Sequence, residues 1–188
     1  MKIFYKIKSF IIKWFGNILI YPYPMFIMFG HTAYQMKGED VRDVINIIQP
    51  GDILLRRYNN YISGLMIPGY YTHAAIYLGN NQIIHMLGDG IDKQDILTFC
   101  RCDRVAIIHC NEEQISKEAI KKARELYVKG MEYDFGFDFS DSTRFSCTEI
   151  INYLYDNPKM ERKKDKYIMP DDYLTLDKSL FTVSYQKG

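Results

Sequence analysis

The chain has 188 residues, with 24 basic and 23 acidic side chains and a formal net charge of +1. This length fits one domain whose core folds without disulfides, and the hydrophobic fraction of 47% excludes a disordered chain. A charge so near zero argues against a general nucleic-acid binder, so no nucleic-acid partner is expected.

The first 37 residues differ in charge from the rest of the chain. They contain no acidic residue and five lysines, a local charge of +5 that leaves −4 for the remainder: Lys2, Lys6, Lys8, Lys13 and Lys37. The stretch 14–30 is uncharged but contains Pro22 and Pro24, which interrupt a helix. We therefore expect a basic, apolar N-terminal arm over residues 1–37 and a catalytic or binding domain over residues 38–188.

Three interpretations of this arm compete. A basic amphipathic helix within residues 2–21 would lie in a membrane interface, or the arm would pack on the domain. A membrane span or a signal peptide ranks second, because the uncharged run is at the lower limit for a span and lacks a convincing cleavage site. A membrane surface is thus an expected partner, and a membrane or cell-envelope location is favoured over the cytoplasm.

The body alternates predicted strands and helices with clear turn signals. A helix over residues 39–48 ends at Pro50-Gly51, and Asn80-Asn81 forms a tight turn between two strands. Strands are expected at 52–57, 72–79, 82–87, 104–110 and 180–185. Helices are expected at 116–129 (Ile120, Ala123, Leu126 and Tyr127 inward) and from Cys147 to Asn157. This order predicts an α+β fold with an antiparallel sheet packed against helices.

Cys147 lies at the predicted start of a helix. Ser146-Cys147-Thr148-Glu149 matches the S-x-x-E capping box, and an apolar run follows it. With Ser146 as the N-cap, the thiol lies near free backbone N–H groups and the positive end of the helix dipole, which lower a thiol pKa. The same N–H groups would stabilise an oxyanion. The alternative is a small buried cysteine with no chemical role.

Two of the four histidines share a predicted hairpin. His73 begins the strand 72–79, and His85 lies on the next strand, 82–87. The turn between them would bring the strands side by side, so that His85 fixes the tautomer of His73, the base that a cysteine nucleophile needs. The alternative is two unrelated histidines at strand ends. His31 belongs to the arm, and His109 has no evident catalytic partner.

The remaining cysteines suggest a metal site only weakly. Cys100 and Cys102 are one residue closer than the usual C-x-x-C pair, and His109 and Cys110 would point to opposite faces of a strand. We expect free thiols, no metal and no cofactor.

Four segments in this order resemble the permuted papain-like amidases of the NlpC superfamily, the YaeF/YiiX group. The segments are PGDILLRR, YTHAAIYLGNNQIIHMLGDGI, MEYDFGFDFSDSTRFSCTEIINYLY and IMPDDYL, and the similarity covers residues 48–185. It implies a permuted papain-like fold, in which the histidine strand precedes the helix that begins with the nucleophile.

The resemblance also implies roles for particular residues. Cys147 matches the nucleophile, His73 the base, and His85 the third, polar triad position, where the YaeF/YiiX pattern usually has glutamate. Tyr133 and Ser146 are expected to line the substrate or oxyanion site. Loop architecture is the first role expected for Asp134, Asp138 and Asp141, with substrate contact second, and Gly51-Asp52 matches a structural turn.

The function expected from these residues is amide cleavage by a Cys-His-His triad through a thio-acyl intermediate. The alternatives are a lipid-directed acyl hydrolase or acyltransferase, and a catalytically silent lipid- or peptide-binding domain of the same fold. The arm and the loop 61–71 favour an acyl-lipid substrate, whereas the acidic loop 134–141 favours a cationic one such as a small peptide with a free amine.

Overall fold

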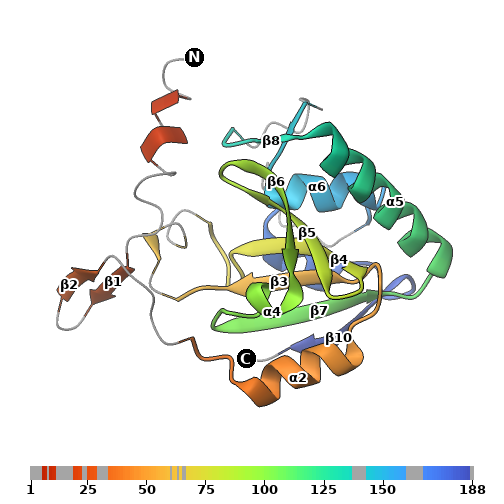
Figure 1. Ribbon diagram of the computed structural model, residues 1–188, viewed down its shortest axis with the longest axis horizontal. Coiled ribbons are helices and arrows are strands. Elements are labelled where there is room, and N and C mark those ends of the chain that lie inside the picture. The colour runs from red at the N-terminus through yellow and green to blue at the C-terminus, as the bar shows by residue number, and fades with distance from the viewer. Residues whose placement is uncertain are drawn as a thin grey trace.

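A six-stranded sheet runs through the centre of the computed structural model (Figure 1). Its order is β10-β7-β3-β4-β5-β6, and every neighbouring pair is antiparallel. The strands are β3 (Ile53–Arg57), β4 (His73–Gly79), β5 (Gln82–Leu87), β6 (Gly90–Asp95), β7 (Arg104–Cys110) and β10 (Phe181–Gln186). The α+β class predicted from the sequence is confirmed.

The structure describes part of the chain. The described residues are 6–7, 9–11, 19–22, 25–28, 34–59, 61–62, 64, 67–136, 143–159 and 167–186. The expectations for His31, Asp138 and Asp141 fall outside them.

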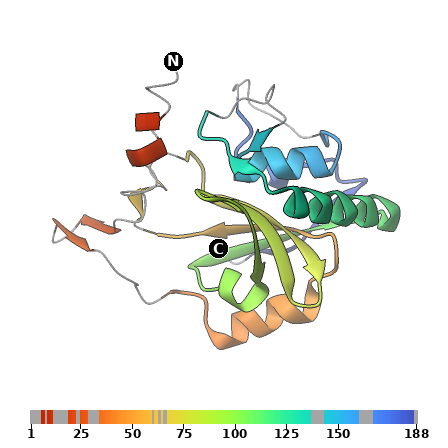
Figure 2. The same cartoon turned by 45° about the horizontal axis from the view of Figure 1, so that its top comes forward.

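Helices cover both faces of the sheet (Figure 2). On one face, α5 (Glu113–Lys129) and α6 (Cys147–Leu154) bury apolar side chains against Ile53 and Leu55. On the other face, α2 (Gly38–Ile47) and the short α4 (Ile96–Phe99) pack against Leu54. Successive residues of β3 thus alternate between two cores, as strand geometry requires when both faces are covered.

The hairpin of β4 and β5 is the element that positions the two histidines. Asn80 and Asn81 have φ angles of 52° and 60°, the left-handed conformation that two-residue turns of twisted hairpins need and that asparagine tolerates. The register pairs Ala75 with His85, so His73 lies two residues along from that pair on the same side of β4. The predicted turn is confirmed.

At the edge of the central sheet, β6 and α4 were not expected from the sequence. Strand β6 pairs with β5 along its whole length, and α4 follows it directly. The sequence GIDKQD contains a single large apolar residue, because β6 lies at the sheet edge and leaves most of its side chains partly exposed. The inward position predicted for Tyr127 is wrong, since that side chain is 39% exposed.

The N-terminal segment contains a second, two-stranded antiparallel sheet. It consists of β1 (Leu19–Pro22) and β2 (Met25–Met28), so the amphipathic helix expected over residues 2–21 is wrong for residues 19–21. Residues 6–7 and 9–11 are helical. Among the described residues, no helix has both the length and the apolar character needed to span a bilayer.

Residues 34–37 lie against the body of the protein. The N–H of Gln35 donates to Asp103 at 3.1 Å, and that of Met36 donates to the carbonyl of Cys102 at 3.2 Å. Met36 is buried in the core beside α2. The division into an arm of residues 1–37 and a domain of residues 38–188 stays a prediction.

Candidate active site

Helix α6 begins at Cys147 because its first turn is capped from both sides. The Ser146 hydroxyl accepts from the N–H of Glu149 at 3.3 Å, and the Glu149 carboxylate accepts from the N–H of Ser146 at 2.6 Å. Both side chains are buried. Ser146 therefore serves as the helix cap, and its expected place in the lining of the substrate or oxyanion site stays a prediction.

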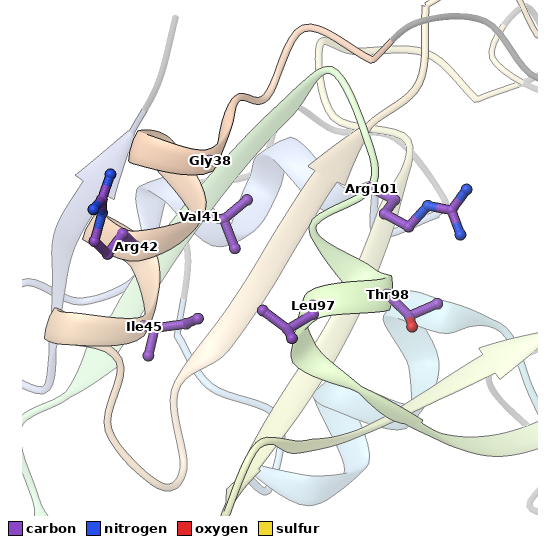
Figure 3. Close-up of a pocket in the computed structure, with 7 residues that line it drawn as sticks. All are labelled: Gly38, Val41, Arg42, Ile45, Leu97, Thr98 and Arg101. Atoms are coloured by element: carbon purple, nitrogen blue, oxygen red, sulfur yellow. The ribbon is translucent and has the colours of Figure 1, made fainter.

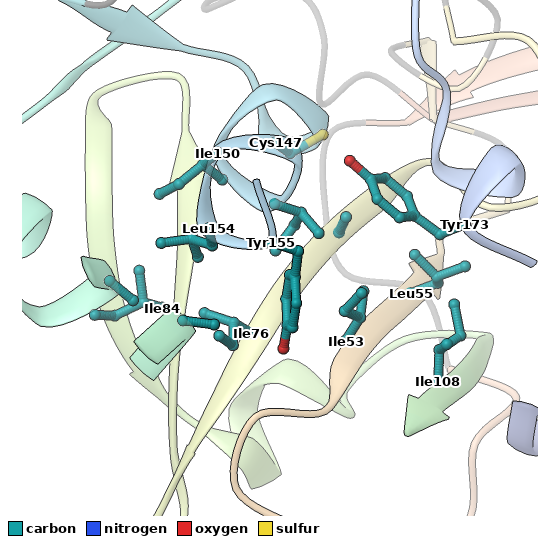
Figure 4. Packing of buried hydrophobic residues seen from close by; sticks show 14 of the residues in the cluster. Ile53, Leu55, Ile76, Ile84, Ile108, Cys147, Ile150, Leu154, Tyr155 and Tyr173 are labelled. Atoms are coloured by element: carbon teal, nitrogen blue, oxygen red, sulfur yellow. The ribbon is translucent and has the colours of Figure 1, made fainter. Parts of the chain in front are cut away.

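Cys147, the first residue of α6, belongs to the buried cluster that contains Ile76, Ile150 and Leu154, and its sulfur points away from Ile150 and Leu154 in the view of Figure 4. The side chain is 3% exposed. The groups next to the thiol that favour its ionised form are the backbone N–H of Ala74, the hydroxyl of Tyr133 and the backbone N–H of Cys147.

Tyr133 reaches the thiol because two short strands run side by side. Strands β8 (Glu132–Tyr133) and β9 (Arg144–Phe145) are parallel, with Tyr133 opposite Phe145. Phe145 precedes Cys147 by two residues, so the pairing brings the phenol to the start of α6. The buried carboxylate of Asp134 accepts from the N–H of Gly136 at 2.7 Å, which gives it a role in shaping this loop.

Two tyrosine hydroxyls fasten α6 to the rest of the domain. Tyr173, in the 3-10 helix Pro170–Thr175, donates to the carbonyl of Thr148 at 2.6 Å. At the other end of α6, Tyr155 donates to the carbonyl of Gly51. Gly51 has a φ of 91°, and a Cβ there would lie 2.4 Å from that of Ser116, so this position requires glycine.

The two predicted histidines contact each other directly. Nε2 of His73 lies 3.0 Å from Nδ1 of His85, a hydrogen bond in which either ring can donate. His85 is fully buried, and His73 is half-buried. Phe99 lies beside both rings. Nδ1 of His73 is the ring nitrogen that this hydrogen bond leaves available.

His73 and Cys147 meet β4 from different sides. Cys147 packs with Ala74 and Ile76, whereas His73 lies on the side of Ala75, towards Phe99. Among the described residues, no hydrogen bond joins the thiol to either imidazole. The two groups are linked by one peptide unit, because the N–H that contacts the thiol belongs to Ala74, the residue after His73.

Sequence reasoning missed two charged neighbours of the histidines. Asp92 on β6 is directly opposite His85, with its Oδ2 3.6 Å from Nε2 of His85. Arg56 on β3 is directly opposite His73. Asp92 could be identified as a neighbour of His85 only after β6 was recognised as a strand. The signal for Arg56 was the alternation of side-chain directions along the predicted strand 52–57.

Burial keeps the thiol protonated. It raises the pKa of Cys147, although the N–H groups of Ala74 and Cys147 and the hydroxyl of Tyr133 favour the thiolate. The lowered thiol pKa predicted from the helix start is therefore wrong in direction, because desolvation outweighs these hydrogen bonds.

The histidines are also uncharged at neutral pH. Burial, then the Arg56 guanidinium and His85, hold the pKa of His73 well below its ordinary value. Burial and Arg56 lower the pKa of His85 to about 3. The resting site thus combines a neutral thiol with neutral imidazoles, which suits proton transfer during attack rather than a preformed ion pair.

The other cysteines and His109 lie away from this arrangement. Cys100, Cys102 and Cys110 are buried free thiols, and His109 pairs through Nδ1 with the buried Asp52 at 2.7 Å. In the part of the chain that the structure describes, no three His, Cys, Asp or Glu side chains converge as metal ligands.

A pocket of about 560 Å³ lies between α2 and α4 (Figure 3). It is on the side of the sheet opposite α6, and its lining contains no cysteine or histidine: Gly38, Val41, Arg42, Ile45, Leu97, Thr98 and Arg101. The candidate chemistry therefore lies at Cys147 rather than in this pocket.

Comparisons with known proteins agree with the fold. A model of the permuted papain-like amidase enzymes of the YaeF/YiiX family matches residues 47–185. The structure is similar to the crystal structure of the metalloprotein YiiX from Escherichia coli O157:H7. The TM-score is 0.58 and the identity 13%, over 74% of this chain and 97% of that chain. No curated protein matches the chain. The expected placement within the NlpC superfamily stays a prediction.

Because its pKa is raised, Cys147 should react with iodoacetamide slowly at pH 7 and faster as the pH rises past the ordinary thiol value of about 8.5. Tyr133→Phe should move this profile to still higher pH, because it removes a hydrogen bond to the thiolate. Peptide mass spectrometry would follow the label, and burial raises the pKa of Cys100 and Cys102 to about 12, which keeps them slow. A rate that reaches its plateau below pH 7 would contradict the raised pKa.

Proposed function

Because this chain belongs to the YaeF/YiiX family of permuted papain-like amidase enzymes, which are cysteine hydrolases, we propose that it cleaves amide bonds. In this proposal Cys147 is the nucleophile, His73 is the base and His85 is the residue that orients His73. The observation that carries this assignment is the 3.0 Å hydrogen bond between Nε2 of His73 and Nδ1 of His85. It occupies one nitrogen of His73 and leaves Nδ1 to accept a proton. A small peptide is the proposed substrate.

In the first step the thiol sulfur bonds to the amide carbon, and its proton passes to Nδ1 of His73. Hydrogen bonds of apo sites often form only when the substrate is bound, so His73 need not contact Cys147 beforehand. Because the two side chains lie on different sides of β4, this transfer requires Nδ1 of His73, at the first residue of the strand, to come within hydrogen-bond reach of the sulfur when substrate binds.

The negative charge that develops on the amide oxygen needs hydrogen-bond donors. The first turn of α6 presents the N–H of Cys147, because the cap uses the N–H of Glu149 instead. The hydroxyl of Tyr133, which already contacts the thiol, is a second donor. The imidazolium then gives its proton to the departing amine, and water attacks the thioester with His73 again as base.

Asp92 completes this proton arrangement from β6. For Nδ1 of His73 to accept, its Nε2 must carry the hydrogen and donate to Nδ1 of His85. His85 then carries its own hydrogen on Nε2, which is buried, has no hydrogen-bond partner among the described residues and faces Asp92 at 3.6 Å. This distance is too long for a hydrogen bond, but the negative charge of Asp92 favours the tautomer of His85 that carries its hydrogen on Nε2 and, through it, the tautomer of His73.

The structurally similar YiiX from Escherichia coli O157:H7 is a metalloprotein. The described residues of this chain offer no convergent set of three metal ligands, so every step above uses the chain's own side chains.

Cys147→Ala and His73→Gln should each lower peptide amide hydrolysis by at least about 10²–10⁴-fold, because nucleophile or base is lost. Amine release from a panel of peptide amides measures turnover, and intact-mass spectrometry detects the thioester adduct. Cys110→Ser is the matched control, since Cys110 is another buried cysteine of the same core. Hydrolysis that survives Cys147→Ala would overturn the proposed nucleophile.

Asp92→Asn should redistribute the ring hydrogens of His85 and His73 and reduce turnover by about tenfold or more with little change in KM. Long-range ¹⁵N–¹H NMR spectra report which ring nitrogen carries the hydrogen. Asp43→Asn, an exposed carboxylate on α2, should leave the spectra unchanged. Identical tautomers in the wild type and Asp92→Asn would refute the role of Asp92.

We also propose that the arm of residues 1–37 binds a membrane surface. Its lysines provide positive charge, and its apolar side chains Ile7, Phe10 and Ile11 are 52%, 59% and 48% exposed. This favours a location at the membrane or cell envelope, and it keeps an acyl lipid as the alternative substrate class.

The triple variant Ile7→Ser, Phe10→Ser and Ile11→Ser should lose most binding to vesicles that contain anionic lipid, because it removes the apolar surface that inserts. Co-sedimentation of the full chain measures this. Val128→Ser is the control, since Val128 is 86% exposed on α5 and outside the arm. Equal sedimentation of the triple variant and the wild type would contradict the proposal.

A further inference from the structure

The side chain of Arg56 is a buried cation without an anionic partner among the described residues. It is 7% exposed, and its Nε is shielded from solvent with no hydrogen-bond acceptor. The guanidinium carbon lies 4.5 Å from the ring centre of Phe99 and 4.9 Å from that of Tyr58. These two contacts hold the group in place and leave the edges of its plane as hydrogen-bond donors.

Buried arginines are normally paired with acids, because removing a charge from water is costly and aromatic contacts offset only part of that cost. The neighbouring Arg57 has neutral acceptors in place of an acid. It is less buried, stacks on Tyr70, and donates to Asn59 at 2.6 Å and to the carbonyl of Tyr70. Arg56 has the same chemistry without such acceptors.

The position of Arg56 connects it to the proposed active site. In the register of β3 and β4, Arg56 is directly opposite His73, and the two side chains lie on the same side of the sheet. Phe99 contacts the guanidinium and also lies beside both imidazoles. At this position the positive charge of Arg56 lowers the pKa of both histidines, in addition to the larger effect of burial.

We infer that Arg56 binds a carboxylate of the substrate beside His73, so that the enzyme favours peptide amides with a free carboxylate close to the scissile bond. This inference rests on the proposed function. A guanidinium donates two parallel hydrogen bonds to a carboxylate, which also carries the opposite charge. A neutral amide lacks that charge. The bound carboxylate would also offset the repulsion between Arg56 and the imidazolium that forms on His73 during attack.

Acetate is the probe for this site, and acetamide is its neutral counterpart of similar size. In NMR titrations of the full chain, acetate should shift the ring signals of His73 and His85 with saturation, and acetamide should not. Arg56→Gln should weaken acetate binding about ten- to hundredfold, as expected for the loss of charge-assisted hydrogen bonds. Arg56→Lys should retain part of the affinity, and Arg57→Gln should bind like the wild type.

Three results would overturn the inference. They are equal shifts of the ring signals with acetate and acetamide, acetate binding that survives Arg56→Gln, or tighter binding of inorganic phosphate than of acetate in the same titration. If Arg56→Gln fails to fold, the wild-type titrations and Arg56→Lys still decide. The titration measures binding without turnover, so the two proposals can fail separately. If Cys147 proves to have no role in hydrolysis, the proposed function is refuted and the anion site at Arg56 is unaffected. If the protein hydrolyses peptide amides but the ring signals do not respond to acetate, the anion site is refuted and the proposed function is unaffected.

Discussion

The reciprocal hydrogen bonds between Ser146 and Glu149 are the constraint on which the site depends. They make Cys147 the first residue of α6 and consume the N–H of Glu149, which leaves the N–H of Cys147 facing the thiol side. A cysteine one position further along α6 would point about 100° further around the helix axis, away from Ala74. The contacts of Tyr133 and of β4 with the thiol matter only because the cap fixes this start.

Burial determines the protonation of the resting site more than any single neighbour does. It is the largest influence on Cys147, His73 and His85, and in each case it favours the neutral form. Arg56 acts in the same direction on the histidines. The thiol and the two imidazoles are therefore neutral in the resting protein, and no ion pair forms between Cys147 and His73.

Much of this arrangement is readable in the sequence where the signals are local. The motif S-x-x-E located the start of α6, and Asn80-Asn81 located the turn that brings His73 and His85 together. The roles assigned to these side chains remain predictions, but their placement follows from short-range chemistry that acts within a few residues.

The parts that the sequence did not reveal depend on long-range pairing. Asp92 lies on an edge strand with too few apolar residues to show a period, and its closeness to His85 follows from the β5–β6 register. The significance of Arg56 depends on what surrounds it, which no local pattern encodes. Desolvation of Cys147 likewise arises from the packing of the whole core, and it reversed the pKa direction that the helix end alone suggested.

The two tyrosine hydroxyls that hold α6 have a mechanical consequence. Tyr173 is bonded to Thr148 in the first turn, and Tyr155 at the last turn is bonded to Gly51. A helix that is hydrogen-bonded at both ends can neither slide along its axis nor rotate about it. These hydrogen bonds therefore hold Cys147, at the start of α6, in a fixed position relative to Gly51 and the 3-10 helix Pro170–Thr175.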